Sequence, residues 1–403
     1  MNSRPSSADI PRGFTFAAIA CGLKKKGLDL ALLTSKTPAS AAAVFTTNRV
    51  QAAPVRLSRE HLRKSRHKIR AVIVNSGNAN CCTGSPGLAA SGKTAAKLSR
   101  LLDCKPHEVL VCSTGVIGVP LRVEKILSAE PQLVRSSSSE AAAFERFTRA
   151  IMTTDTRPKW AVAKFRIGGK QVSVLGCAKG SGMIAPNMAT MLGFLATDAA
   201  ISPPLLSRAL RTVVARSFNA ITVDGDTSTN DTVALLANGE SGAKKITKQD
   251  SNYRRFIAAL ENVCTSLALS IVADGEGAQR VIKIEVRGAV SDRAANTIAR
   301  TIAHSPLVKT AFAGADPNWG RILAAAGRSG VPFDPDKVDI RLAGIRVCRR
   351  GREYPFDEHA AHRKMLAKYV QVVLNLNAGC GVARVWTCDF TAEYVRINAS
   401  YRT

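Results

Sequence analysis

Short apolar runs alternate along the chain with amphipathic stretches, a pattern typical of an α/β protein. Runs with the length and composition of strands lie at 71–74, 109–112, 172–175 and 281–286. Between them, apolar residues recur at helical spacing over 206–218 and over 256–267. The first of these two helices follows a Ser-Pro pair that is a typical start signal. The pattern therefore predicts a chain in which strands and helices are interleaved.

Near the end of the chain, three short stretches at 338–342, 345–348 and 353–356 predict an antiparallel meander. The sequence has no repeat of fixed period and no long linker that would mark a domain boundary. We therefore predict a layered α/β fold with mixed sheets. Its 403 residues are enough to bury a large core, and this length predicts two domains or one domain split into two halves.

The charge of the chain is strongly positive. Fifty-seven Lys and Arg against thirty Asp and Glu give a net charge of +27, which raises nucleic acid as a partner. The densest basic stretch, 56–70, contains no aromatic residue, so it offers no platform on which bases could stack. Its spacing instead predicts the solvated face of a helix before the strand at 71–74. We expect a basic surface and no nucleic-acid partner.

The first residues carry no apolar run of the kind found in signal peptides, and no stretch approaches the length of a membrane span. The ten cysteines are scattered without CxxC pairs, which favours reduced, mostly buried thiols. We expect a soluble cytoplasmic protein that makes no contact with a membrane.

The stretch GLAASGKT at 87–94 matches the phosphate-binding loop pattern of nucleoside triphosphatases. That loop functions only directly after a strand, where backbone amides converge on the phosphates. Here the polar run 75–86 separates it from the nearest predicted strand. A helix of small residues over 88–102 is therefore the favoured interpretation.

A metal site is not expected. His359 and His362 have the spacing of one helical face, but no third ligand and no HExxH pattern accompany them. A solvated histidine pair is the favoured interpretation, and no flanking residues suggest a histidine base for serine or cysteine catalysis.

The segment KGSGMIAPNMATML at 179–192 carries the most informative chemistry of the chain. Two glycines and a proline indicate a tight turn rather than a helix, and an apolar, strand-like run follows over 191–196. Cleavage between Ala189 and Thr190 would leave a threonine whose hydroxyl lies next to its own free amine. The hydroxyl can then act as the nucleophile and the amine as its general base. Taken alone, the pattern also fits an ordinary glycine turn before a buried strand.

A second candidate is STGVIG at 113–118, directly after the strand predicted at 109–112. A Thr-Gly step at the end of a strand can present a hydroxyl and an unhindered amide to one point. Such donors form an oxyanion hole, in which each contributes roughly 10²–10³ in rate. The alternative is again a simple glycine turn. Further polar clusters next to apolar runs lie at 75–80, 153–156 and 274–277.

Together these segments resemble the ornithine acetyltransferase family of arginine biosynthesis, from about residue 10 to the last residue. The resemblance is carried by KGSGMIAPNMATML at 179–192, STGVIG at 113–118, NSGNAN at 75–80, MTTDT at 152–156, VDGDTSTND at 223–231, DGEGA at 274–278, DPNWGR at 316–321 and INASYRT at 397–403.

This resemblance implies a precursor that cleaves itself before Thr190 into an α chain, 1–189, and a β chain, 190–403. The two chains would assemble as an α2β2 heterotetramer. The implied fold is a layered α/β sandwich similar to the amino-terminal-nucleophile architecture. One departure is Ala185, where many relatives carry histidine, and this change could alter the rate of processing.

Carried over by motif, the resemblance implies a role for each of several residues. Thr190 is expected to be the nucleophile, and Thr114 and Gly115 the oxyanion-hole pair. The expected substrate contacts, besides Thr190 itself, are Thr153, Lys179, Glu276, Asn398 and Thr403.

The implied reaction is ping-pong transfer of an acetyl group from N2-acetyl-L-ornithine to L-glutamate, without a cofactor. The sequence leaves open whether acetyl-CoA is also a donor. An amidohydrolase or aminopeptidase of the same architecture, which transfers the acyl group to water, is the alternative.

Overall fold

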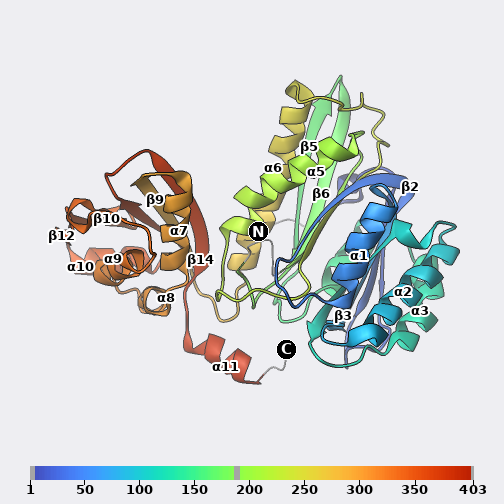
Figure 1. Cartoon of the computed structure of the whole chain (residues 1–403), viewed down its shortest axis with the longest axis horizontal. Helices are drawn as coiled ribbons and strands as arrows, with labels where there is room; N and C mark the ends of the chain where they lie inside the picture. The colour runs from blue at the N-terminus through green and yellow to red at the C-terminus, as the bar shows by residue number, and fades with distance from the viewer. Residues whose placement is uncertain (1–4, 186–190, 401–403) are drawn as a thin grey trace.

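The computed structural model describes residues 5–185 and 191–400, which form two β-sheets flanked by helices (Figure 1). The larger sheet has eight strands in the order β4-β3-β2-β8-β7-β6-β5, with β1 paired to β2. The β3–β4 and β7–β8 pairs are parallel and the others antiparallel, so the sheet is mixed. Its strands are β1 (Phe14–Ile19), β2 (Leu30–Phe45), β3 (Lys68–Asn78), β4 (Val109–Val116), β5 (Lys159–Ile167), β6 (Lys170–Lys179), β7 (Leu192–Thr197) and β8 (Thr232–Ala237).

The central strands of this sheet are buried on both faces. Every residue of β7 and β8 is buried. Leu195 and Leu235 pack with α5 (Pro203–Arg216) and α6 (Ser251–Val272), whereas the adjacent Phe194 and Leu236 pack on the opposite side with α4 (Ala141–Ala150). Two covered faces explain why these strands read as continuous apolar runs rather than alternating ones. The predicted layered α/β sandwich with mixed sheets is therefore confirmed.

Three helices cover the end of the larger sheet that contains β3 and β4: α1 (Ala53–Lys64), α2 (Gly84–Leu101) and α3 (Val123–Arg135) (Figure 1). The basic stretch predicted to be a helix face is largely α1. Helix α2 begins before Gly87, so the GLAASGKT segment lies inside a helix. Gly87 packs closely against Thr83 and Asn80, and its amide donates to the Thr83 carbonyl. This segment therefore has the conformation of a helix rather than of a phosphate-binding loop.

The smaller sheet forms a second lobe with its own core (Figure 1). Its strands lie in the order β12-β11-β10-β13-β9-β14, and β10 to β12 form the predicted antiparallel meander. The last strand of the meander is shorter than predicted. The elements are β9 (Val281–Ala289), β10 (Asp339–Leu342), β11 (Ile345–Arg349), β12 (Arg352–Glu353), β13 (Tyr369–Asn375), β14 (Gly381–Cys388), α7 (Asp292–Ala303), α8 (Pro306–Ala313), α9 (Trp319–Gly327) and α10 (Glu358–Met365).

No boundary between the two lobes was predicted, because only the short stretch 273–280 joins α6 to β9 and nothing in its composition marks a boundary. One expectation needs correction. Helix α6 is long and apolar enough to cross a membrane by length and composition, contrary to the expectation that no stretch is. One side of α6, including Leu260 and Leu267, is buried in the core against β5 and β6.

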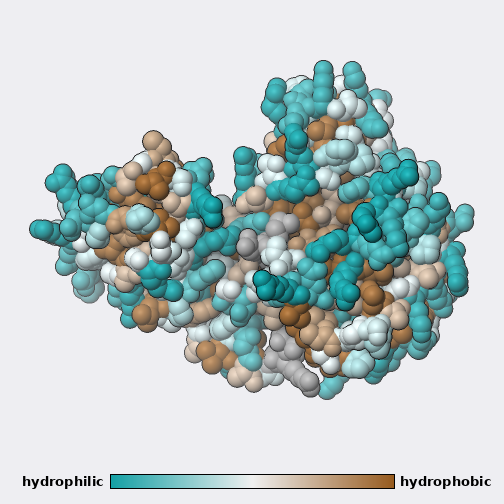
Figure 2. Space-filling view, in the orientation of Figure 1, coloured by the Kyte–Doolittle hydropathy of each residue, from teal (hydrophilic) through white to brown (hydrophobic). Residues whose placement is uncertain are grey.

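Beyond β14, the chain continues as α11 (Ala392–Ser400), which lies at the bottom of the view in Figure 1, and its Tyr394 and Asn398 line a cavity together with residues of β4 and β6. Hydrophilic side chains dominate the outer ends of both lobes on the face shown in Figure 2, in keeping with the large net charge. Helix α11 therefore places a C-terminal segment next to the ends of strands from the larger sheet.

Candidate functional site

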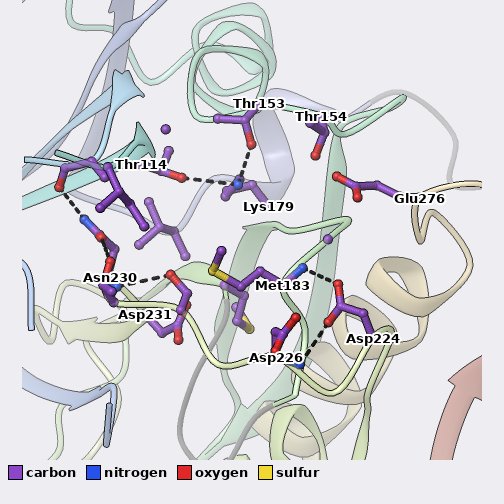
Figure 3. Close-up of a pocket in the computed structure, with 18 of the residues that line it drawn as sticks. Thr114, Thr153, Thr154, Lys179, Met183, Asp224, Asp226, Asn230, Asp231 and Glu276 are labelled. Carbon is purple, nitrogen blue, oxygen red and sulfur yellow. Dashed lines mark hydrogen bonds between the residues drawn. The ribbon is translucent and has the colours of Figure 1, made fainter. Parts of the chain in front are cut away.

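A cavity of about 230 Å³ lies where the ends of β4 and β6 meet the start of β7, the segment 224–231 and α11 (Figure 3). These elements are far apart in the sequence, and the larger sheet brings them together. Six of the residues predicted for the site line this cavity: Thr114, Gly115, Thr153, Lys179, Glu276 and Asn398. Three others, Ala189, Thr190 and Thr403, lie outside the described residues.

Among the described lining residues, Lys179 at the end of β6 is the cation. Its Nζ donates to the Thr153 hydroxyl at 2.7 Å and to the Thr114 hydroxyl at 3.3 Å (Figure 3). Burial lowers the pKa of Lys179, and the Asp155 carboxylate, 4.0 Å away, opposes that shift by favouring the charged amine. An ammonium group between two hydroxyls suits the binding of a carboxylate.

A buried cluster of ion pairs lies next to Lys179. Lys159 donates to Asp155 at 2.6 Å and to Asp274 at 2.5 Å, and all three side chains are almost fully buried. Burial alone would raise the pKa of Asp155, but the charges of Lys159 and Lys179 outweigh it and hold that pKa at about 2. The Gly180 amide donates to the same carboxylate at 2.7 Å. The cluster thus fixes the end of β6, where Lys179 lies.

Glycine is required at position 115 by the parallel pairing of β4 with β3. Gly115 lies opposite Gly77 and has a φ of 131°, in the region that L side chains rarely adopt. A Cβ at this position would come within 2.4 Å of the Gly77 carbonyl carbon. Asn230 also holds the end of β4, because its side-chain amide donates to the Ser113 carbonyl at 2.9 Å. The neighbouring Thr114 hydroxyl is thereby held facing Lys179, a geometry suited to stabilising an oxyanion.

Glu276 lies on the opposite side of the cavity, in the connection between α6 and β9. Its amide donates to the Ser181 carbonyl at 3.1 Å. Its carboxylate accepts from the Asn398 side chain at 2.8 Å, which ties α11 to the cavity. Glycine at 182 leaves room for this carboxylate, since a Cβ there would lie 2.4 Å from Glu276 Oε2.

The segment 223–231 was recognised as a motif, but no role was predicted for its residues. In the structure, Asp224, Asp226, Asn230 and Asp231 all line the cavity (Figure 3). Burial raises the pKa of Asp224, which is opposed by backbone hydrogen bonds to its carboxylate. With Lys179 on one side and carboxylates on the other, the cavity suits a ligand that carries separated negative and positive charges. Seven polar residues within nine positions were the only signal in the sequence.

The ends of the segment that contains the predicted cleavage site are also at the cavity. Met183, before it, and Met191 and Leu192, after it, line the cavity wall. By contrast, the quoted motif at 316–321 contributes no residue to the described lining. It lies around the N-terminus of α9 in the second lobe.

Comparison with known proteins gives a consistent result. The family model described as the ArgJ family matches residues 15–403. The chain is 47% identical over 398 residues to the arginine biosynthesis bifunctional protein ArgJ of Thermotoga neapolitana, covering 98% of this chain and 100% of that one. It is 48% identical over 400 residues to the protein of the same name from Dehalococcoides mccartyi, covering 98% and 97%.

A solved structure supports the same relationship. The crystal structure of arginine biosynthesis bifunctional protein ArgJ from Bacillus halodurans is similar to this chain with a TM-score of 0.51 and 42% sequence identity. The match covers 53% of this chain and 100% of that chain.

Proposed function

The chain belongs to the ArgJ family, and from this premise we propose that it transfers the acetyl group of N2-acetyl-L-ornithine to L-glutamate through an acetyl-Thr190 intermediate. It is an acyltransferase of arginine biosynthesis, as its relatives are bifunctional enzymes of that pathway. One observation carries the proposal. The Lys179 amine, flanked by two threonine hydroxyls, shares a cavity with Glu276 and Asn398, and Met191 lines the same cavity.

The enzyme first cleaves its own precursor. The Thr190 hydroxyl attacks the Ala189 carbonyl, and the acyl group moves from the threonine nitrogen to its oxygen. Water then hydrolyses the resulting ester. The products are chains 1–189 and 190–403, and the second chain begins with a threonine whose free amine can accept the proton of its own hydroxyl.

Acetyl transfer then takes place in two half-reactions. The Thr190 oxygen attacks the acetyl carbonyl as its proton passes to the α-amine. The Thr114 hydroxyl and the backbone at Gly115 stabilise the oxyanion. The bond to ornithine N2 breaks, and that nitrogen takes the proton as ornithine leaves. In the second half, the amine of glutamate attacks the threonine ester, which gives N-acetylglutamate and restores the hydroxyl.

Charge complementarity orients both substrates. The α-carboxylate of either amino acid binds Lys179 and the Thr153 hydroxyl, which Lys179 Nζ approaches at 2.7 Å. Glu276 attracts the side-chain ammonium of ornithine, and Asn398 holds the Glu276 carboxylate in place. Thr403 completes the set of substrate contacts, as the family resemblance implies.

We further propose that acetyl-CoA acts as a second acetyl donor to glutamate, since the relatives are named bifunctional. The α and β chains assemble as an α2β2 heterotetramer in the cytoplasm. All ten cysteines are free thiols, which fits a reducing compartment.

Two experiments test the proposal. On a denaturing gel, the parent enzyme should give two bands and Thr190→Ala a single precursor band. A Thr190→Ala variant that still splits between 189 and 190 would rule out this nucleophile. Steady-state assays should then offer glutamate with N-acetylornithine and with acetyl-CoA separately. Release of acetate from N-acetylornithine at the same rate without glutamate would instead identify an amidohydrolase.

A further inference from the structure

The short segment 222–227 runs beside residues 183–185 and binds them at several points. Ile184 and Thr227 form an antiparallel bridge. The Ile184 carbonyl accepts from the Val223 amide at 2.6 Å and from the Thr222 hydroxyl at 2.8 Å. The Thr227 hydroxyl donates to the Ala185 carbonyl at 3.2 Å. Residues 183–185 are therefore held on the larger lobe by a second segment that is distant in sequence.

The Asp224 carboxylate makes the central contact of this pairing. Its Oδ2 accepts from the Met183 amide at 2.5 Å, and its Oδ1 accepts from the Ile184 amide at 2.8 Å (Figure 3). The Asp226 amide donates to Oδ1 at 3.2 Å. Two consecutive amides of one turn thus converge on a single carboxylate, an arrangement that stabilises negative charge.

Convergence of these amides depends on an unusual backbone conformation. Met183 has a φ of 56°, in the left-handed region that residues with a side chain rarely adopt. The preceding residue is Gly182, where a Cβ would collide with the Glu276 carboxylate. The Asp224 carboxylate is the acceptor on which the Met183 and Ile184 amides converge. Asp224 therefore stabilises a turn that the chain would otherwise disfavour.

The other flank of the cleavage segment is fixed by the same part of the chain. The Met191 carbonyl accepts from the Thr232 amide at 3.1 Å, at the start of the parallel pairing of β7 with β8. The stretch 222–232 therefore anchors Ala185 on one side and Met191 on the other. In this way it holds Ala185 and Met191, the described residues on either side of the 189/190 bond.

We propose that Asp224 is a positioning residue for self-cleavage of the precursor, an inference that rests on the function proposed above. Its carboxylate holds the turn at Met183 and Ile184, and the attack of Thr190 on the Ala189 carbonyl depends on that turn. Both of its oxygens accept backbone amides, so the role proposed here for Asp224 is exerted through the backbone.

The test is the rate of precursor cleavage in Asp224→Asn. An asparagine has one acceptor oxygen where aspartate has two, so one of the two amides loses its partner. We expect cleavage to slow by at least about tenfold, since small misplacements of reacting groups have effects of that size. The rate is followed on denaturing gels after pulse expression, and the melting temperature is measured on the same samples.

Asp250→Asn is the matched control. Asp250 also accepts two consecutive amides, from Asn252 at 3.0 Å and Tyr253 at 3.1 Å, but it does so at the N-terminus of α6. We expect it to cleave at the rate of the parent. An Asp224→Asn variant that cleaves as fast as Asp250→Asn would overturn the proposal. A parent chain that is never cleaved would instead refute the proposed function itself.

A second variant keeps the test decisive if Asp224→Asn does not fold. Thr227→Val keeps the shape of the side chain but removes the hydroxyl that donates to Ala185. We expect about a twofold to fivefold slower cleavage, with the KM for glutamate in the fully cleaved enzyme unchanged. Cleavage of Thr227→Val at the parent rate, in a sample that melts as the parent does, would also count against a role of the segment 222–227 in cleavage.

Discussion

The two sheets of this protein contribute to the cavity in different ways. The eight-stranded sheet supplies Thr114 and Lys179 directly from the ends of β4 and β6. Among the described residues, no strand residue of the six-stranded sheet lines the cavity. That second lobe contributes instead through the connections at its edges: Glu276 comes before β9, and Tyr394 and Asn398 come after β14.

This difference separates rigid from adjustable parts of the site. Lys179 is set in a sheet that is buried on both faces, above an ionic cluster. Helix α11, by contrast, has no buried residue. It is held by the Asn398–Glu276 hydrogen bond, by a hydrogen bond from Thr391 to the Gly277 carbonyl, and by stacking of Tyr394 on Phe390 at 4.6 Å. The comparison indicates that the larger sheet fixes the groups proposed to react, while the second lobe supplies further residues of the cavity wall.

The largest effect is expected for Lys179→Met. Loss of the cation removes the proposed carboxylate partner and leaves Asp155 with one fewer neighbouring positive charge. We expect kcat/KM to fall by roughly 10³ or more, because a buried charge-assisted contact to substrate is lost. Lys164→Met is the control, since Lys164 pairs with Asp9 on the outside of β5. If Lys179→Met keeps kcat/KM within about threefold, the larger sheet does not hold the substrate as described.

The next effect tests whether the end of β4 is sterically fixed. Gly115→Ala combines an unfavourable φ with a contact of 2.4 Å to the Gly77 backbone. Gly118→Ala is the matched control, because Gly118 also has a positive φ, of 78°, but has open space around its Cβ position. We expect Gly115→Ala to lower the free energy of unfolding by about 3 kcal/mol or more, and Gly118→Ala by about 1 kcal/mol. Equal losses in urea unfolding would show that the backbone at the β3–β4 pair has room to adjust.

A smaller effect is expected on the side of the second lobe. Asn398→Ala removes the hydrogen bond between α11 and Glu276 but leaves the larger sheet intact. We expect KM to rise by about tenfold, with kcat changed by much less. Ser400→Ala, on the same helix, should leave both parameters unchanged, since its hydroxyl bonds only to the Arg396 carbonyl of its own helix. A loss confined to kcat in Asn398→Ala would place Asn398 with the reacting groups.

The smallest effect concerns stability outside the cavity. Glu130 of α3 is fully buried, neither of its oxygens has a hydrogen-bond partner in the described part of the chain, and burial raises its pKa from 4.5 to about 8. Below pH 4.5 this carboxyl is protonated in both states, so it causes no penalty. As the pH rises toward 8, the unfolded chain releases the proton while the folded chain retains it, and the folded state is progressively destabilised.

Glu130→Leu should therefore raise the melting temperature by a few degrees, which corresponds to about 1 kcal/mol or more. The gain over the parent should be larger at pH 8 than at pH 5. Activity at pH 7 should not change, because Glu130 is not among the residues that line the cavity. A gain independent of pH would indicate a packing effect rather than a titrating carboxyl.

Local patterns were sufficient for much of the fold. The apolar runs in β3, β4, β6 and β9 and the helical spacing in α5 and α6 were read correctly, because burial imposes periodicities that a single sequence carries. The bounds of the second lobe could not be predicted, because its core depends on pairing β9 with β13 and β14, which lie about ninety residues later in the chain.

The same limit applies to the candidate site. Thr114, Lys179 and Glu276 could be chosen from motifs, and the structure brings them to one cavity. The cluster of Asp155, Lys159 and Asp274 could not be found in this way, since the ion pair between Lys159 and Asp274 joins residues 115 positions apart. No periodicity records that Lys159 lies between two carboxylates. Long-range electrostatic contacts of this kind become visible only once the sheet has brought the segments together.

The most direct test of the account is intact-mass spectrometry of purified enzyme incubated with N-acetylornithine in the absence of glutamate. The account predicts two chains, 1–189 and 190–403, with one acetyl group added to the second chain at Thr190 and lost when glutamate is supplied. An active enzyme that stays a single chain, or that turns over without ever carrying acetyl on Thr190, would contradict it.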